Sequence, residues 1–117
     1  MLPVLSLGCA GTIDGTAGFF PKSVVYLYEL SINEKLIELG YLKRRELQYK
    51  ISAVEELVVR YGTVGIKEAI SRILQFGDRD GTRLPLCGGI PGGDSEWENW
   101  KDVIGELETV EKSLPII

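Results

Sequence analysis

Residues 60–77 read RYGTVGIKEAISRILQFG, and the apolar side chains in this stretch recur with the period of a helix. The positions follow the spacing i, i+3, i+4, i+7 and i+8, which forms one continuous apolar stripe along an amphipathic helix. They are occupied by Ile66, Ala69, Ile70, Ile73 and Leu74. The stretch therefore predicts a helix that packs one face on a core and ends before Gly77, since glycine commonly follows the last turn.

The opposite face of this predicted helix is polar. It carries Lys67, Glu68, Ser71, Arg72 and Gln75. A lysine that points to water keeps its proton at neutral pH and is a poor nucleophile. We therefore interpret Lys67 as a surface lysine. The alternative is an enzyme in which Lys67 or Lys22 acts as amine or base, but the sequence places no group beside either lysine that would lower its pKa.

Helical spacing continues towards the N-terminus and predicts a chain that is mostly α. A helix is expected over 21–30, with Pro21 at its first position. Another is expected over 34–60, with a break or kink at Gly40 or Tyr41. Its buried face is expected at Leu36, Leu39, Leu47, Ile51, Val54, Leu57 and Val58. The 34–60 helix should end at the RYG of the opening stretch.

Residues 77–94 follow the opening stretch and are rich in Gly, Pro and Asp. This composition predicts a long irregular loop, which we expect to be anchored by Leu84, Leu86 and Ile90. A phosphate-binding loop is disfavoured, because the order G-x-x-x-x-G-K-[ST] is missing. The segment is therefore interpreted as a tether between two helices.

The last helix is expected from about residue 96 to about 113. Ser95 followed by Glu98 has the spacing of a capping box, which typically starts a helix. Its buried face is expected at Trp97, Trp100, Ile104, Leu107 and Leu114. Two tryptophans at i, i+3 beside aliphatic residues favour core packing over a ligand-stacking site.

The N-terminal segment is the least regular part of the sequence. Residues 2–9 are apolar and fit either a short helix or a strand. The following GCAGTIDGTAGFFP has four glycines, which predicts a short buried strand over 11–18 that passes close to another backbone or a ligand. A lone strand leaves backbone groups unpaired on both edges, so self-association or a binding partner is expected.

Composition limits the function classes. The 117 residues fit one modest domain. A net charge of −4 without a basic patch argues against nucleic-acid binding, and no apolar run approaches the ~20 residues that span a bilayer. With no histidine, and with Cys9 and Cys87 far apart, no metal site or cofactor is expected. Two free thiols favour an intracellular location, in the cytoplasm or in mitochondria.

Three segments in order, GCAGTIDGTAGFFPK, LKRRELQ and RYGTVGIKEAISRILQFGDRDGTRLPL, resemble the carboxy-terminal part of a known enzyme family. This is the dihydrodipicolinate synthase and N-acetylneuraminate lyase family of pyruvate-type class I aldolases. The third segment looks most like the branch with 4-hydroxy-2-oxoglutarate and 2-keto-3-deoxy sugar-acid aldolases. The resemblance covers nearly the whole chain.

The resemblance implies a fold. The family has a (β/α)8 TIM barrel of roughly 250 residues with a trailing helical subdomain. The chain is accordingly expected to be a C-terminal fragment of such a barrel, with one β/α unit plus the C-terminal helical subdomain. Residues 1–31 would be the barrel remnant, formed by its seventh helix, last strand and last helix, and residues 32–117 the helical subdomain.

The resemblance also implies which functional groups are present. The family's Schiff-base lysine and its Y-x-x-P tyrosine align upstream of Met1, so no catalytic residue is expected in this chain. Substrate binding is expected only at Ile13, through a main-chain contact to the pyruvate moiety of a keto acid, with Gly11 allowing close approach. Gly18 departs from the family, which usually has asparagine there.

Two functions remain open. The chain is expected to be a truncated member of this lyase family, inactive alone, whose parent performs aldol cleavage or condensation of keto acids. Alternatively, it is a non-catalytic helical module that binds a full-length aldolase, the missing barrel or another partner.

Overall fold

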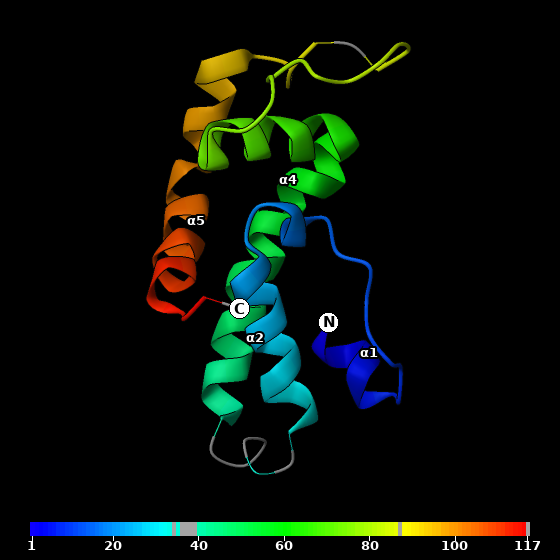
Figure 1. Ribbon diagram of the computed structural model, residues 1–117, viewed down its shortest axis with the longest axis vertical. Coiled ribbons are helices and arrows are strands. Elements are labelled where there is room, and N and C mark those ends of the chain that lie inside the picture. Colours follow the sequence, from blue (N-terminus) through cyan, green and yellow to red (C-terminus); the bar gives the residue numbers. More distant parts are fainter. Residues whose placement is uncertain (34, 36–39, 87, 117) are drawn as a thin grey trace.

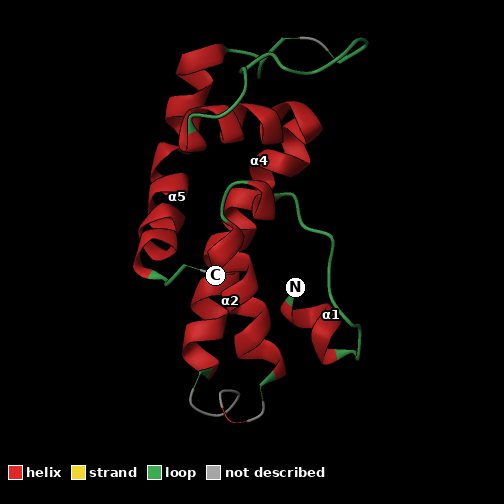
Figure 2. Ribbon diagram, viewed as in Figure 1, coloured by secondary structure: helices red, strands yellow, loops and turns green. Residues whose placement is uncertain are grey.

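The computed structural model describes residues 1–33, 35, 40–86 and 88–116, and this part of the chain is helical. Its elements are α1 (Leu2–Ser6), the short 3-10 helix η1 (Thr16–Gly18), α2 (Pro21–Ile32), α4 (Tyr41–Leu74) and α5 (Gly93–Ser113). The described residues contain no strand (Figure 2). The prediction of a mostly α fold is therefore confirmed, whereas the origin in a barrel and the boundary between residues 31 and 32 stay predictions.

The molecule is elongated, 45 × 26 × 23 Å, with its core where three helices meet. The chain runs down α2 and returns along the first half of α4, and α5 lies beside α4 (Figure 1). Buried side chains come from all three helices and from the turn before α2: Phe19, Phe20, Val24, Leu27, Leu30, Leu47, Ile51, Val54, Leu57, Ala69, Ile104 and Leu107. The apolar face expected for the 34–60 helix is confirmed at four of these positions, and Leu36 and Leu39 lie outside the described residues.

A kink at Gly62 divides α4. Gly62 has φ 57° and ψ −139°, values that favour glycine, and the second half of α4 turns across the end of the molecule (Figure 1). The kink replaces the helix end predicted at this point. Just before the kink, the hydroxyl of Tyr61 donates a hydrogen bond to Glu96 on α5, and the indole Nε1 of Trp100 donates to the same carboxylate at 3.2 Å. In the second half of α4, Arg72 donates to Asp94 of α5 at 2.6 Å. The two halves of α4 are thus both held against α5.

The strand predicted over 11–18 is wrong. The chain passes through an irregular segment into η1, where the backbone N–H of Thr16 donates to the Asp14 carboxylate at 2.8 Å. A strand needs a neighbouring strand to pair its backbone groups, and none exists in the described part of the chain. The unpaired strand edges, on which the expectation of a partner rested, are therefore absent.

The start of α5 and the anchoring of the loop before it also differ from prediction. The helix begins at Gly93, after Gly92 with φ 89°, so the capping box at Ser95 and Glu98 does not form. Of the three expected loop anchors, only Ile90 is buried. The other two, Leu84 and Leu86, are exposed.

The buried face of α5 is narrower than expected. Ile104 and Leu107 are buried, whereas Trp97, Trp100 and Leu114 are only partly buried.

The apolar start forms a helix, α1, which resolves the choice between helix and strand for this segment. The backbone N–H of Leu2 donates to Gln48 Oε1 on α4 at 2.8 Å and so fixes α1 beside α4. Among the residues described, no helix combines the length and the apolar character needed to cross a bilayer.

Candidate functional site

The predicted substrate contact, Gly11 and Ile13, lies in the irregular segment between α1 and η1. Both residues are exposed, and the Ile13 side chain is fully so. A Cβ atom added at Gly11 would meet no atom within 4 Å, so the glycine does not serve a close approach within this chain. The structure thus leaves the backbone of this segment open to another molecule.

A pair of carboxyl groups follows this segment. Asp14 ends it, and Glu55 projects from α4. Partial burial of Glu55, together with a hydrogen bond and charge repulsion from Asp14, raises the pKa of Glu55 to about 7. The contact is supported by close packing next to it, because a Cβ atom at Gly15 would lie 2.9 Å from Val58 Cγ1, one helical turn beyond Glu55.

The carboxyl pair can hold one proton between two acidic groups near neutral pH. Such a group has the pKa that general acid–base chemistry requires. Sequence reasoning missed Glu55, because its partner is 41 positions away and only the tertiary fold brings the two together. The charge of the N-terminal amino group of Met1 acts in the opposite direction and lowers the Glu55 pKa.

Lys67 is exposed, as predicted from the helical stripe. Its ammonium group donates a hydrogen bond to the carbonyl oxygen of Gly81 at 2.6 Å. Lys22 is partly buried and donates in the same way to the carbonyl of Leu114 at 2.9 Å. Both lysines thus use the side-chain nitrogen to bind a backbone carbonyl oxygen of another segment.

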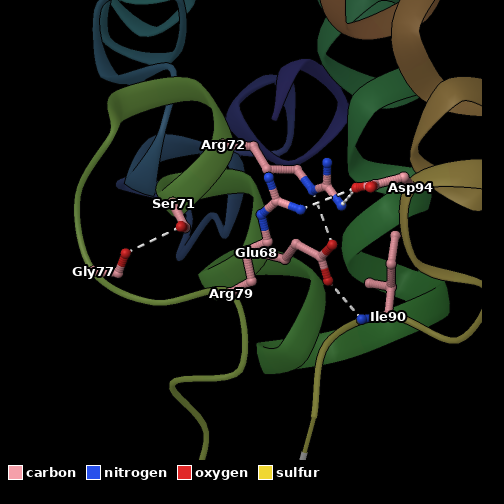
Figure 3. A network of polar contacts seen from close by, with 7 residues as sticks. All are labelled: Glu68, Ser71, Arg72, Gly77, Arg79, Ile90 and Asp94. Carbon is pink, nitrogen blue, oxygen red and sulfur yellow. Dashed lines mark hydrogen bonds and ion pairs between the residues drawn. The ribbon is translucent and has the colours of Figure 1, made fainter.

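Glu68 was expected on the polar face of α4, and this expectation is wrong, because the residue is only 2% exposed. Figure 3 shows that each of its two carboxylate oxygens accepts a hydrogen bond. Oε1 accepts from Arg72 Nε at 2.9 Å, and Oε2 accepts from the backbone N–H of Ile90 at 2.5 Å. The carboxylate therefore joins α4 to the loop over residues 75–92.

Arg72 extends this network to the start of α5. Its second terminal nitrogen donates to Asp94 Oδ1 at 2.6 Å, and Arg79 from the loop donates to the same oxygen at 3.0 Å (Figure 3). The hydrogen bond from Arg72 lowers the pKa of Asp94. The four charged side chains thus balance one another across α4, the loop and α5, and we interpret the network as structural.

Gly89 shows how closely the loop approaches the network. A Cβ atom at this position would lie 2.6 Å from Glu68 Oε2, well inside contact distance. A larger residue at position 89 would therefore have to displace the Glu68 carboxylate, which accepts the hydrogen bond from Ile90.

A cavity of about 290 Å³ lies between α2, α4 and the end of α5. Its walls include Tyr26, Leu47 and Val110, and the ammonium group of Lys43 lies 5.7 Å from the centre of the Tyr26 ring. None of the predicted site residues lines it. Among the described residues, no three His, Cys, Asp or Glu side chains are grouped so that they could hold a metal ion.

No family model, curated protein or solved structure matches the chain.

Proposed function

We propose that the chain is the C-terminal part of a pyruvate-type class I aldolase and that it does not catalyse the reaction by itself. The observation that supports this proposal is the position of Lys67. It is the lysine of the aldolase-like segment VGIKEA, yet it lies on an exposed helix face and donates to the Gly81 carbonyl. Class I aldolases need an amine that forms an imine with the substrate, and positioning without that nucleophile recovers only part of the rate.

In the intact enzyme, the segment with Gly11 and Ile13 would supply a main-chain contact to a keto acid of the pyruvate type. Its exposure supports this role, because a backbone that is open here is available to a ligand or to the rest of a barrel. The activity of the parent would be aldol cleavage or condensation. The groups that form the imine would come from residues outside the printed sequence.

Trapping with borohydride tests the absence of catalysis. The purified chain is incubated with pyruvate and sodium borohydride, and the mass of each peptide is measured. We expect no reduced pyruvate adduct at Lys67 above the level at other exposed lysines, such as Lys101. The matched control is Lys67→Arg, which keeps the charge but cannot form an imine. A selective adduct at Lys67 that this substitution removes would overturn the proposal.

A separate test concerns the family. The genomic sequence upstream of Met1 should encode, in frame, a Y-x-x-P segment and a strand with a G-x-K lysine. If the upstream sequence encodes neither, the chain is not part of such an enzyme.

The second candidate function is a non-catalytic helical module that binds a full-length aldolase, the missing barrel or a further copy of itself. Two apolar side chains of the N-terminal segment favour it: Leu7 and Ile13 are open to solvent, and a partner that covers them would remove apolar surface from water. Sedimentation velocity tests the self-associating form. A monomer at every concentration, unchanged by Leu7→Ser with Ile13→Ser, would contradict this form of the proposal.

A further inference from the structure

The outer face of α4 carries side chains at alternating spacings of three and four residues. They are Leu42, Arg45, Tyr49, Ser52, Glu56 and Val59, which we call the α4 stripe, and all six are exposed. Its three apolar members are large and open to solvent: Leu42 is 76%, Tyr49 74% and Val59 76% exposed.

The stripe lies on the side of α4 that faces away from the core. The core side is formed by Leu47, Ile51 and Val54, which are buried against α2 and α5. The stripe is therefore a second seam on the same helix. A repeat of 3.5 residues keeps such a seam facing one partner helix along its length, as in coiled coils.

The charges in the stripe favour a second α4 helix as the partner and set the relative direction of the two helices. In an antiparallel pair of α4 helices, each position faces its counterpart from the other end of the stripe. The facing residues are then Leu42 with Val59, Arg45 with Glu56, and Tyr49 with Ser52, each pair occurring twice. In a parallel pair, Arg45 would face Arg45 and Glu56 would face Glu56, which repel each other. The stripe is thus self-complementary only in the antiparallel arrangement.

The surface beside the stripe is hollowed. A cavity of about 710 Å³ lies between α1 and α4 and is lined by Leu2 and Pro3 on one side. On the other side it is lined by four members of the stripe, Leu42, Arg45, Tyr49 and Ser52, with Glu46 and Gln48. The hydrogen bond from Leu2 to Gln48 fixes this wall, so a second helix meets a formed groove.

We propose that the α4 stripe is an interface between two copies of this chain, packed antiparallel about a two-fold axis midway between Tyr49 and Ser52. The seam from Leu42 to Val59 extends over about 26 Å at the rise of an α-helix. The α4 stripe does not include Leu7 or Ile13, and the proposal does not depend on the aldolase assignment.

Charge reversal tests the pairing. In sedimentation velocity over a concentration series, the chain should show a monomer–dimer equilibrium. Arg45→Glu places two like-charged pairs in the dimer and should raise its dissociation constant about tenfold, and Glu56→Arg should do the same. The double variant exchanges the two charges and should restore association. Lys101→Glu on α5, a reversal outside the stripe, should have no effect.

Cysteine pairing tests the direction. In a background of Cys9→Ser and Cys87→Ser, Leu42→Cys with Val59→Cys should give an oxidised dimer whose disulfides join position 42 to position 59. Leu42→Cys alone should form no disulfide-linked dimer under the same conditions, because in the antiparallel dimer the two copies of position 42 lie at opposite ends of the seam. Peptide mass spectrometry identifies the linkage.

Three results would overturn the proposal. They are a monomer at every concentration, association that responds to neither single reversal or is not restored in the double variant, and disulfides between the two copies of position 42. The circular dichroism spectrum of each variant serves as the folding control.

Discussion

Two glycine-rich segments of this molecule differ in how firmly they are held against the rest of the structure. The loop over residues 75–92 is held to α4 and α5 by a buried carboxylate and by two arginines, and its Ile90 side chain is only 4% exposed. The segment over residues 7–15 leaves Leu7 and Ile13 in solvent. Whether a glycine-rich segment is fixed therefore depends on the tertiary partner opposite it and not on its own residues.

The difference bears on function. In the 75–92 loop, the charged groups of the network are matched within the chain, and its backbone approaches Glu68 so closely that a Cβ atom at position 89 would lie 2.6 Å from the carboxylate. That loop acts as scaffold. The 7–15 segment keeps its surface open, which supports its proposed contact with a keto acid or with the rest of an enzyme.

The largest expected effect on stability comes from removing the Glu68 carboxylate, which holds the 75–92 loop to α4. Glu68→Ala leaves the partly buried Arg72 guanidinium with only the exposed Asp94 carboxylate and leaves the Ile90 N–H without its acceptor, so the free energy of unfolding should fall by about 3 kcal/mol. Urea denaturation measures it. Glu106→Ala, on the exposed side of α5, should change it by less than about 0.5 kcal/mol. Equal stability of the two variants would refute the role of Glu68.

A smaller effect is expected where the 7–15 segment leads into α2. The Glu111 carboxylate on α5 accepts from the backbone N–H groups of Lys22 and Ser23, at 3.0 and 2.7 Å, and from the Ser23 hydroxyl at 2.6 Å. It thereby caps the first turn of α2 from another helix. Glu111→Ala should cost about 2 kcal/mol in the same denaturation experiment. Glu106→Ala on the exposed face of α5 is the control, and a loss no larger than the control's would show that the cap is dispensable.

The pH dependence of stability tests the contact between Asp14, at the end of the 7–15 segment, and Glu55 on α4. Because the folded-state pKa of Glu55 is about 7 and an unfolded glutamate titrates near ~4.3, the folded chain binds more protons between these values. The free energy of unfolding should therefore fall as pH rises through this window, by about 1 kcal/mol once solvent screening of this half-exposed group is allowed for. Glu55→Gln should remove this component of the slope. A variant with an unchanged slope would contradict the Asp14–Glu55 contact.

The smallest effect is expected in the open segment itself. Gly11→Ala and Ile13→Ala should each change the free energy of unfolding by less than about 0.5 kcal/mol, because neither position contacts a buried group. Thermal denaturation at fixed pH measures both. A loss above about 1 kcal/mol for either variant would mean that the 7–15 segment is packed against the rest of the molecule. It would then not differ from the 75–92 loop in this respect.

Sequence periodicity predicted the helices because their core faces repeat within one element, as Ile51 and Leu57 do in α4. It failed where a distant segment decides the environment. Glu68 looks like a surface residue from its helical position, but the 75–92 loop folds back over it. The glycines of the 11–18 segment suggested a strand, which could not form because the described part of the chain offers no strand to pair with. Asp14 and Glu55 lie on segments that are far apart in the sequence, so no local sequence pattern predicted their contact.

Hydrogen exchange of backbone amides tests the contrast between the two segments most directly. The Ile90 amide, which donates to the buried Glu68 carboxylate, should exchange orders of magnitude more slowly than the amides of Gly11 and Ile13. Glu68→Gln should speed exchange at Ile90 and leave Gly11 and Ile13 unchanged. If Ile90 exchanges as fast as Ile13 in the unaltered protein, the buried carboxylate does not fasten the loop and the account is wrong.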